Sequence, residues 1–269
     1  MKKFSIVHIP VFSFFSQNLY REVALVWKGT CFPYLLLLLA ICWIPDMVRL
    51  QLSFNDFVHN DAPKVISQVP PITIVDGTAF VDASQPYFIV DPETNAKIFI
   101  IDTTGRFTSL RGTEAYGLLT GTEAIIMKSQ YETRTFTFKN VEHFSINAQR
   151  ISGWLETARR YAIPTLFPFA VAGSFLYRVV QALVYALLGM LMAALCKRKL
   201  LYQSLVRLAV VAVTPCIVVA TLLGIFDVTL PFDGLWYFLA AMAYLFFGIQ
   251  VSRRESGDSN DPGSEPLHG

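Results

Sequence analysis

Four long apolar stretches dominate the pattern of hydrophobic and polar positions along the chain. They cover residues 31–50, 162–196, 204–226 and 232–251. An α-helix rises about 1.5 Å per residue, so each stretch can cross a hydrocarbon core of roughly 30 Å. The pattern therefore predicts a membrane protein with four α-helical transmembrane spans.

The second stretch is the longest and contains two polar residues, Arg178 and Gln181. It is too long for one straight span and short for two, and a division at Arg178 would give five spans. With four spans, every basic cluster falls on one side, which the positive-inside rule assigns to the cytoplasm. We therefore expect both termini in the cytoplasm, with residues 162–177 forming an interfacial or tilted entry to the second span. The flanking basic residues are Lys2, Lys3, Arg21, Lys28, Lys197, Arg198, Lys199, Arg207, Arg253 and Arg254.

The two ends of the chain differ in character. Residues 1–30 form a cytoplasmic lead, and apolar residues recur within residues 12–28 at helical spacing, namely Phe12, Phe15, Leu19, Val23 and Val26. This spacing predicts an amphipathic helix in the membrane interface, with Tyr20 and Trp27 at headgroup depth; the alternative is a flexible tail. Residues 252–269 are polar and rich in Gly, Pro and Ser, which predicts a disordered cytoplasmic tail.

Residues 51–161 are the largest region outside the spans, about 110 residues, and a common domain size. Strand-like runs alternate here with turn residues such as Asp76-Gly77, a strong turn pair. The expected strands are Ile72–Val75, Tyr87–Val90, Lys97–Ile101, Glu123–Lys128 and Glu132–Phe138, the second and third forming a hairpin and the last alternating Thr and Phe. Helices are expected at Thr113–Leu119 and Ala148–Tyr161. These signals predict a small α+β extracytoplasmic domain between spans 1 and 2, with about four to six strands.

Composition supports the membrane class. Hydrophobic residues make up 54% and charged residues 16% of the chain, against roughly 25% charged in soluble proteins. The formal net charge of +2 argues against a cationic nucleic-acid binder. All four cysteines lie in or beside the spans, so the domain at residues 51–161 contains no disulfide. We expect no metal and no cofactor.

Two polar groups in residues 51–161 invite a chemical interpretation. Asp102-Thr103-Thr104-Gly105 resembles the Asp-Thr-Gly loop of aspartic peptidases, but an extra Thr separates Asp102 from Gly105 and no second copy exists. An Asx or Ser/Thr turn is the expected structure. His59 with Asp56 and Asp61 is the other group, and its spacing is not that of a familiar metal site.

Polar residues inside spans carry more weight, because a charge in the bilayer is costly. Arg178 and Gln181 lie one turn apart, as do Asp46 and Arg49. We consider an Asp46–Arg178 ion pair, with interfacial snorkelling of both side chains as the alternative. Arg207 opens the third span, and Pro215 should kink it.

The chain resembles the DUF1189 family of bacterial integral membrane proteins over roughly residues 10–250, and its last spans are distantly similar to Yip1-type proteins. The resemblance rests on the order of short motifs and implies no catalytic residues; it implies a multi-pass location in the bacterial inner membrane and gives a weak link to sugar utilisation. The motifs are Phe14, Phe15, Tyr20, Gly29, Tyr34-Leu35-Leu36, Pro70-Pro71-Ile72-Thr73-Ile74, Asp76-Gly77, Pro86-Tyr87, Ile100-Ile101-Asp102-Thr103-Thr104-Gly105, Tyr202-Gln203, Arg207-Leu208 and Thr214-Pro215.

These observations favour a protein without catalytic activity whose outer domain binds a protein partner or an envelope ligand. Its expected partners are the lipid bilayer and a membrane or envelope protein, or a second copy of the chain, and not nucleic acid. A transporter or transport accessory, possibly sugar-linked, is the first alternative, although four spans are few and no inverted repeat is visible. A membrane enzyme is the second, although no nucleophile–base pair appears.

Overall fold

The computed structural model describes residues 9–29, 31–129, 132–198 and 200–252. The chain divides into two compact units. One comprises Met1–Val48 with Leu166–Gly269, and the other Arg49–Thr165, close to the expected domain at residues 51–161. The tail predicted at residues 252–269 lies outside the described residues from position 253 onward.

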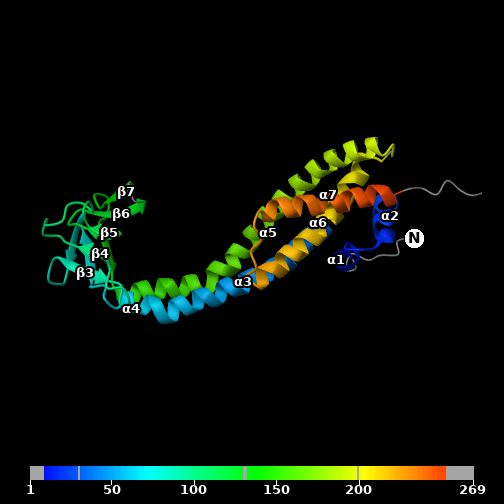
Figure 1. The fold of residues 1–269 in the computed structure, drawn as a ribbon. Coiled ribbons are helices and arrows are strands. Elements are labelled where there is room, and N and C mark those ends of the chain that lie inside the picture. Colours follow the sequence, from blue (N-terminus) through cyan, green and yellow to red (C-terminus); the bar gives the residue numbers. More distant parts are fainter. Residues whose placement is uncertain (1–8, 30, 130–131, 199, 253–269) are drawn as a thin grey trace, which may run out of the picture. The chain divides into compact units, whose positions relative to one another are not determined.

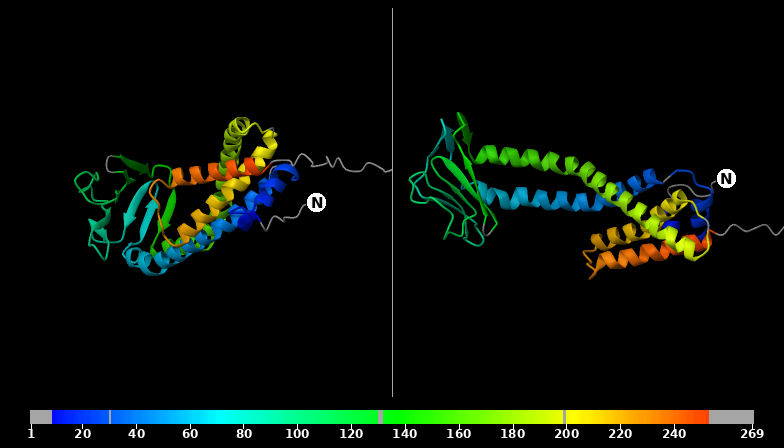
Figure 2. Two further views of the ribbon diagram at one scale, coloured as in Figure 1. Left: turned by 45° about the vertical axis from the view of Figure 1, so that its right-hand side comes forward. Right: turned by 90° about the horizontal axis from the view of Figure 1, so that it is seen from above.

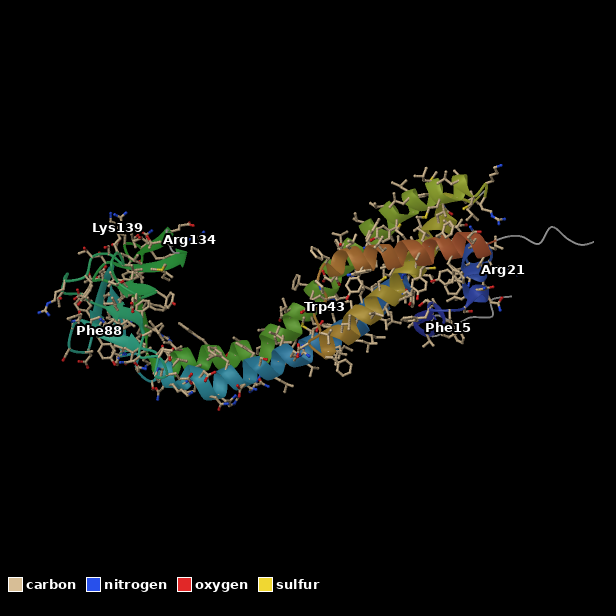
Figure 3. All side chains as sticks on the ribbon, in the orientation of Figure 1. Phe15, Arg21, Trp43, Phe88, Arg134 and Lys139 are labelled. Atoms are coloured by element: carbon tan, nitrogen blue, oxygen red, sulfur yellow. The ribbon has the colours of Figure 1, made fainter. Side chains whose placement is uncertain are left out.

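Four helices in the described part of the chain are long and apolar enough to cross a membrane, as the sequence predicts. They are α3 (Phe32–Asp56), α5 (Ala148–Leu195), α6 (Tyr202–Ile225) and α7 (Asp233–Val251), drawn in Figure 1. The first continues through η2 (Phe57–Asp61) and α4 (Ala62–Ile66). Large apolar side chains project outward from α5 and α7 (Figure 3).

Helix α5 is continuous from Ala148 to Leu195, a run of 48 residues. Residues 162–177 are therefore part of one helix that also contains Arg178, and not a separate entry element. The five-span alternative requires a break at Arg178, and the helix has none there. Whether residues 162–177 lie at a membrane interface stays a prediction.

The N-terminal lead forms α1 (Ile9–Phe12) and α2 (Gln17–Leu25). The Ser16 side chain caps α2 by accepting a hydrogen bond from the backbone N–H of Leu19. The helix predicted over residues 12–28 is interrupted between α1 and α2, and Phe15 of its expected apolar face is exposed. Helix α2 is amphipathic, and its apolar face packs against α6 and α7, which lie next to it in both views of Figure 2. Tyr20 and Trp27 are buried in the protein, and their expected position at headgroup depth stays a prediction. The apolar face is covered by protein because α6 and α7 offer it a matching surface.

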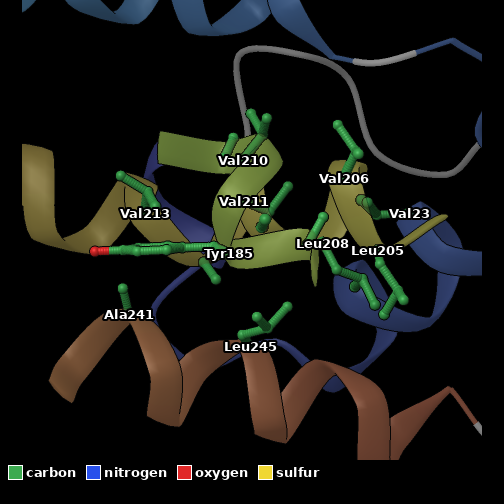
Figure 4. Packing of buried hydrophobic residues seen from close by; sticks show 14 of the residues in the cluster. Val23, Tyr185, Leu205, Val206, Leu208, Val210, Val211, Val213, Ala241 and Leu245 are labelled. Atoms are coloured by element: carbon green, nitrogen blue, oxygen red, sulfur yellow. The ribbon is translucent and has the colours of Figure 1, made fainter. Parts of the chain in front are cut away.

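Helix α6 occupies the centre of this unit, and the side chains from Ser204 to Ile217 are all buried. Figure 4 shows Leu208 and Val211 of α6 close to Leu245 of α7. Gly189 lets α5 approach both of these helices, because a Cβ there would lie 3.3 Å from Leu245 Cδ2 and 3.4 Å from Leu205 Cδ2. Small residues at such crossings let helices pack closely.

The second unit contains eight strands in two sheets among the described residues, more than the four to six expected in one sheet. The three-stranded antiparallel sheet has the order β2-β1-β8 and the other has the order β3-β4-β5-β6-β7, in which only β4 and β5 are parallel. The strands are β1 (Ile72–Val75), β2 (Thr78–Val81), β3 (Tyr87–Val90), β4 (Lys97–Ile101), β5 (Gly117–Leu119), β6 (Glu123–Ser129), β7 (Glu132–Thr137) and β8 (His143–Ile146).

The expected hairpin of Tyr87–Val90 with Lys97–Ile101 is confirmed by the antiparallel pairing of β3 with β4. The helix expected at Thr113–Leu119 is wrong, because Gly117–Leu119 form the central strand β5. All three residues of β5 are buried, and Gly117 lies directly against the ring of Phe99. A short strand that is buried on both faces does not alternate between apolar and polar residues. Its sequence pattern therefore cannot be distinguished from that of one turn of a buried helix.

Two apolar clusters hold the second unit together. One joins residues of both sheets, including Ile74, Ile89 and Leu119. The other, which includes Ile100 and Leu118, packs on the opposite face of the five-stranded sheet under Leu110 and Ala115. The five-stranded sheet is therefore covered on both faces over β4 and β5.

Candidate functional site

Asp76 and Gly77 form the two-residue turn between β1 and β2. Both have positive φ angles, 47° and 77°, as a type I′ hairpin turn requires. Their backbone N–H groups donate to the carbonyls of Glu142 and Val141, at 2.9 and 3.0 Å. The predicted turn is confirmed, and its role in the structure is to fix the hairpin against the segment before β8.

Asp102 is fully buried at the end of β4. Its carboxylate accepts hydrogen bonds from the backbone N–H and hydroxyl of Thr104, at 3.0 and 2.5 Å, and from the backbone N–H of Phe107 at 2.6 Å. Burial alone would raise the pKa of Asp102, but these hydrogen bonds outweigh it and lower the pKa below its ordinary value. With Gly105 at φ 85°, the expected Asx turn is confirmed, and the carboxylate is occupied in holding the loop.

Arg178 donates a hydrogen bond to Gln181 Oε1 at 2.6 Å, and the Gln181 amide donates to the Tyr185 hydroxyl at 2.8 Å. The considered ion pair with Asp46 is not formed among the described residues, where Asp46 is exposed. Trp43 of α3 donates to the Ser174 hydroxyl of α5 at 2.9 Å. Asp46 comes after Trp43 in the chain, in the direction of the second unit. Arg178 comes after Ser174, in the direction that leads away from the second unit. The two charged residues therefore lie on opposite sides of the Trp43–Ser174 contact.

Arg49 is exposed on α3. Pro215 is buried in α6, which stays α-helical on both sides of it. Its neighbour Thr214 accepts a hydrogen bond from the Tyr34 hydroxyl at 3.2 Å. Pro215 is thus buried in the helical unit next to a residue that contacts α3, and the expected kink stays a prediction.

Arg207 is buried and binds the end of the N-terminal lead. Its guanidinium donates to the carbonyls of Val23, Ala24 and Gly29, at 3.0, 3.3 and 3.2 Å, and to the Ser204 hydroxyl at 2.9 Å. The carbonyls at a helix C-terminus carry partial negative charge and lack helical partners, so a buried cation satisfies them. The sequence places Arg207 at the start of the third span but gives no sign of this distant contact.

Among the described residues, three of the four sheet edges in the second unit have one strand residue bonded by a residue from outside the sheet ladder. The Gln68 amide bonds both the N–H and the carbonyl of Val90 on β3, at 3.0 and 2.9 Å. The Arg150 guanidinium donates to the Ser145 carbonyl on β8, and Ala79 of β2 donates to the Gly121 carbonyl at 2.7 Å. A hydrogen bond of this kind occupies one position of an edge and hinders pairing with another chain there.

Strand β7 forms the fourth edge. Phe138 donates to the Thr122 carbonyl at 2.9 Å, in register with the β6–β7 ladder. Backbone direction alternates along a strand, so Thr133, Thr135 and Thr137 direct their N–H and carbonyl groups away from β6. Within the described residues, no other segment bonds these outward groups, and every side chain of β7 is exposed.

A cavity of about 580 Å³ lies beside this edge. Its apolar lining comes from Leu110, Ile125 and Met127, and its polar lining includes Arg111, Thr133 and Thr135. Ile125 and Met127 pair across β6–β7 with Thr135 and Thr133, so these four side chains share one face of the sheet.

The opposite face of β7 carries Arg134 and Phe136, both exposed. Arg134 and Lys139 project at the same end of the domain (Figure 3). A strand lying along β7 would therefore meet a cavity with both apolar and polar lining on one face and a basic side chain on the other. The alternation of Thr with Phe at Glu132–Phe138 was the sequence signal for the strand, but nothing in the sequence marks it as the uncovered edge.

The described residues thus define a class of protein: an apolar helical bundle that carries a two-sheet domain inserted between its first two long helices. The chain belongs to the DUF1189 family, described as a protein of unknown function, whose family model matches residues 11–249. No curated protein and no solved structure matches the chain. The resemblance to DUF1189 is confirmed, and the likeness of the last spans to Yip1-type proteins stays a prediction.

Proposed function

We propose that this chain is a membrane-anchored binding protein whose domain at residues 51–161 holds an extended segment of a partner protein along β7. The four apolar helices anchor it in the bacterial inner membrane. Both termini face the cytoplasm and the domain faces outward, since the basic residues flank the spans on one side.

The observation that carries the proposal is the difference between β7 and the other three edges. Gln68, Arg150 and Gly121 cover β3, β8 and β2, while the outward groups of Thr133, Thr135 and Thr137 have no such cover among the described residues. An uncovered edge recognises an extended peptide through main-chain hydrogen bonds, with pockets for alternate side chains providing specificity.

The surroundings of β7 indicate the chemistry of that peptide. One face of the added strand would place apolar side chains over Leu110, Ile125 and Met127. The other face would place a side chain beside Arg134, where an acidic residue forms a cross-strand ion pair. The partner segment is therefore extended, with apolar residues alternating with polar ones and an acidic residue on the polar face.

The polar side chains of the bundle support an anchoring role for it. Arg178 and Gln181 bond within α5, and Arg207 bonds the end of α2. Side chains engaged in this way serve packing, whereas transport or catalysis in the membrane needs polar groups directed at a substrate.

The experiment uses the full chain in its native membranes, with photoreactive benzoylphenylalanine in place of Thr133. We expect one cross-linked partner segment of the stated chemistry. Thr135→Pro removes an outward N–H that β6 does not use and should abolish the cross-link. Thr135→Val retains the N–H and the branched shape and should preserve it.

The same photoreactive residue at Thr94, in the covered β3–β4 hairpin, is the negative control. A cross-link that survives Thr135→Pro, or that is equally strong from Thr94, would overturn the proposal. Substrate flux or turnover by the purified protein alone, unaffected by Thr135→Pro, would favour the transporter or the enzyme alternative.

A further inference from the structure

The loop that joins α5 to α6 retains a positive charge at a position that favours glycine. Lys197 has φ 53°, and its N–H donates to the Ala194 carbonyl at 3.0 Å while the N–H of Arg198 donates to Ala193 at 2.8 Å. This pair of bonds is a Schellman motif, in which the residue with positive φ is usually glycine. The loop therefore combines tight backbone geometry with two adjacent basic side chains.

A cavity of about 380 Å³ opens beside this loop. Its lining is apolar except for one side chain, and consists of Met190, Ala193, Ala194, Arg198, Leu200 and Leu201. Leu201 of this lining and the nearby Leu195 are 78% and 77% exposed. A cavity with one cationic group and an exposed apolar rim matches an amphiphile that has one anionic group.

The Arg198 guanidinium has an unused donor. Its Nε is buried and has no hydrogen-bond partner among the described residues. A buried donor on a charged group is destabilising unless an acceptor reaches it. Guanidinium groups bind phosphate with two parallel N–H donors, so a phosphate oxygen is a fitting acceptor.

We propose that this cavity binds the phosphate of an anionic phospholipid. Arg198 donates to the phosphate, Lys197 adds electrostatic attraction, and the acyl chains lie along Leu195 and Leu201. The apolar rim distinguishes a lipid from free phosphate, which gains nothing from the leucines. The inference rests on the membrane anchoring in the proposed function, and is independent of partner binding at β7.

The test is native mass spectrometry of the full chain in detergent, titrated with phosphatidylglycerol, phosphatidylcholine or inorganic phosphate. We expect selective binding of phosphatidylglycerol. Arg198→Gln should weaken it about tenfold or more. Lys197→Gln, next to the cavity but outside its lining, is the matched control and should weaken it about two- to threefold, since it removes only a surface charge.

Ala194→Leu fills the cavity without changing the charge and should also abolish binding, which provides a second variant if Arg198→Gln does not fold. Equal binding of the two lipids, equal effects of Arg198→Gln and Lys197→Gln, or displacement of the lipid by millimolar inorganic phosphate would each overturn the proposal. Release of the protein from membranes by alkaline carbonate would instead refute the anchoring on which it rests.

Discussion

The guanidinium of Arg207 donates a hydrogen bond of 3.0 Å to the carbonyl of Val23, a residue 184 positions earlier in the chain. This contact joins the start of α6 to the end of α2, where Ala24 and Gly29 offer further carbonyls. The N-terminal lead is thereby an integral part of the helical unit.

Replacing Arg207 should loosen the lead. Arg207→Met keeps the length of the side chain but leaves the carbonyls at the end of α2 without a donor, so we expect a loss of about 2–3 kcal/mol in the free energy of unfolding. Thermal unfolding in detergent measures it. Arg21→Met, which removes an exposed arginine of α2, should have little effect, and equal melting temperatures for the two variants would contradict the assigned role.

Gly248 should not tolerate a side chain. A Cβ at this position would lie 2.8 Å from Tyr20 Cδ1 and 3.1 Å from Leu208 Cδ2, so Gly248→Ala should destabilise the protein by about 1–3 kcal/mol through overpacking. Gly224→Ala is the control, because nothing lies within 4 Å of its Cβ position. Since alanine favours helices, that variant should be neutral or slightly more stable, and a reversed order would refute the packing.

The stability of the domain should depend on Asp102 in a defined pH range. The pKa of its carboxyl is lowered in the folded state, so its contribution is complete above the ordinary pKa and is lost as the pH falls through the folded pKa. Asp102→Asn places an amide donor opposite a backbone N–H and should cost about 1–3 kcal/mol at neutral pH.

That difference between Asp102→Asn and the unmodified protein should shrink as the pH falls below about 4. Urea unfolding at several pH values, followed by the intrinsic fluorescence of the protein, measures this difference in the free energy of unfolding. Asp82→Asn, at an exposed position, is the control. A difference that grows at acid pH would show that Asp102 is not held as a carboxylate.

Topology offers a direct check on orientation. Alkaline phosphatase is active only outside the cytoplasm, so its fusion after Gly121 should be active and its fusion after Lys199 inactive, given the one-sided basic residues. Enzyme activity in whole cells measures both. The opposite pattern would place the domain with its β7 edge in the cytoplasm.

Local patterns predicted the parts of this structure that depend on neighbouring residues. The apolar stretches give the four long helices, and Asp76-Gly77 and the turn after Val90 give two hairpins. Strand β5 is too short, at three residues, to produce a periodic signal, and the four-residue strands β2 and β8 are not predicted either, because neither has a continuous apolar run such as that of β3. Contacts such as Arg207 with Val23, or Gln68 with Val90, join residues far apart in the chain, so no local pattern reports them.

The first and the last strands of the domain, β1 and β8, form one ladder, in which Ile72 pairs with Ile146. During synthesis, β1 and β2 emerge first and can form their hairpin, but their sheet stays incomplete until His143–Ile146 have been made. A chain that stops before His143 leaves the second edge of β1 open to other chains. The domain thus acquires its closed form only when the ribosome has produced nearly all of the domain, which makes sheet closure a marker of its complete synthesis.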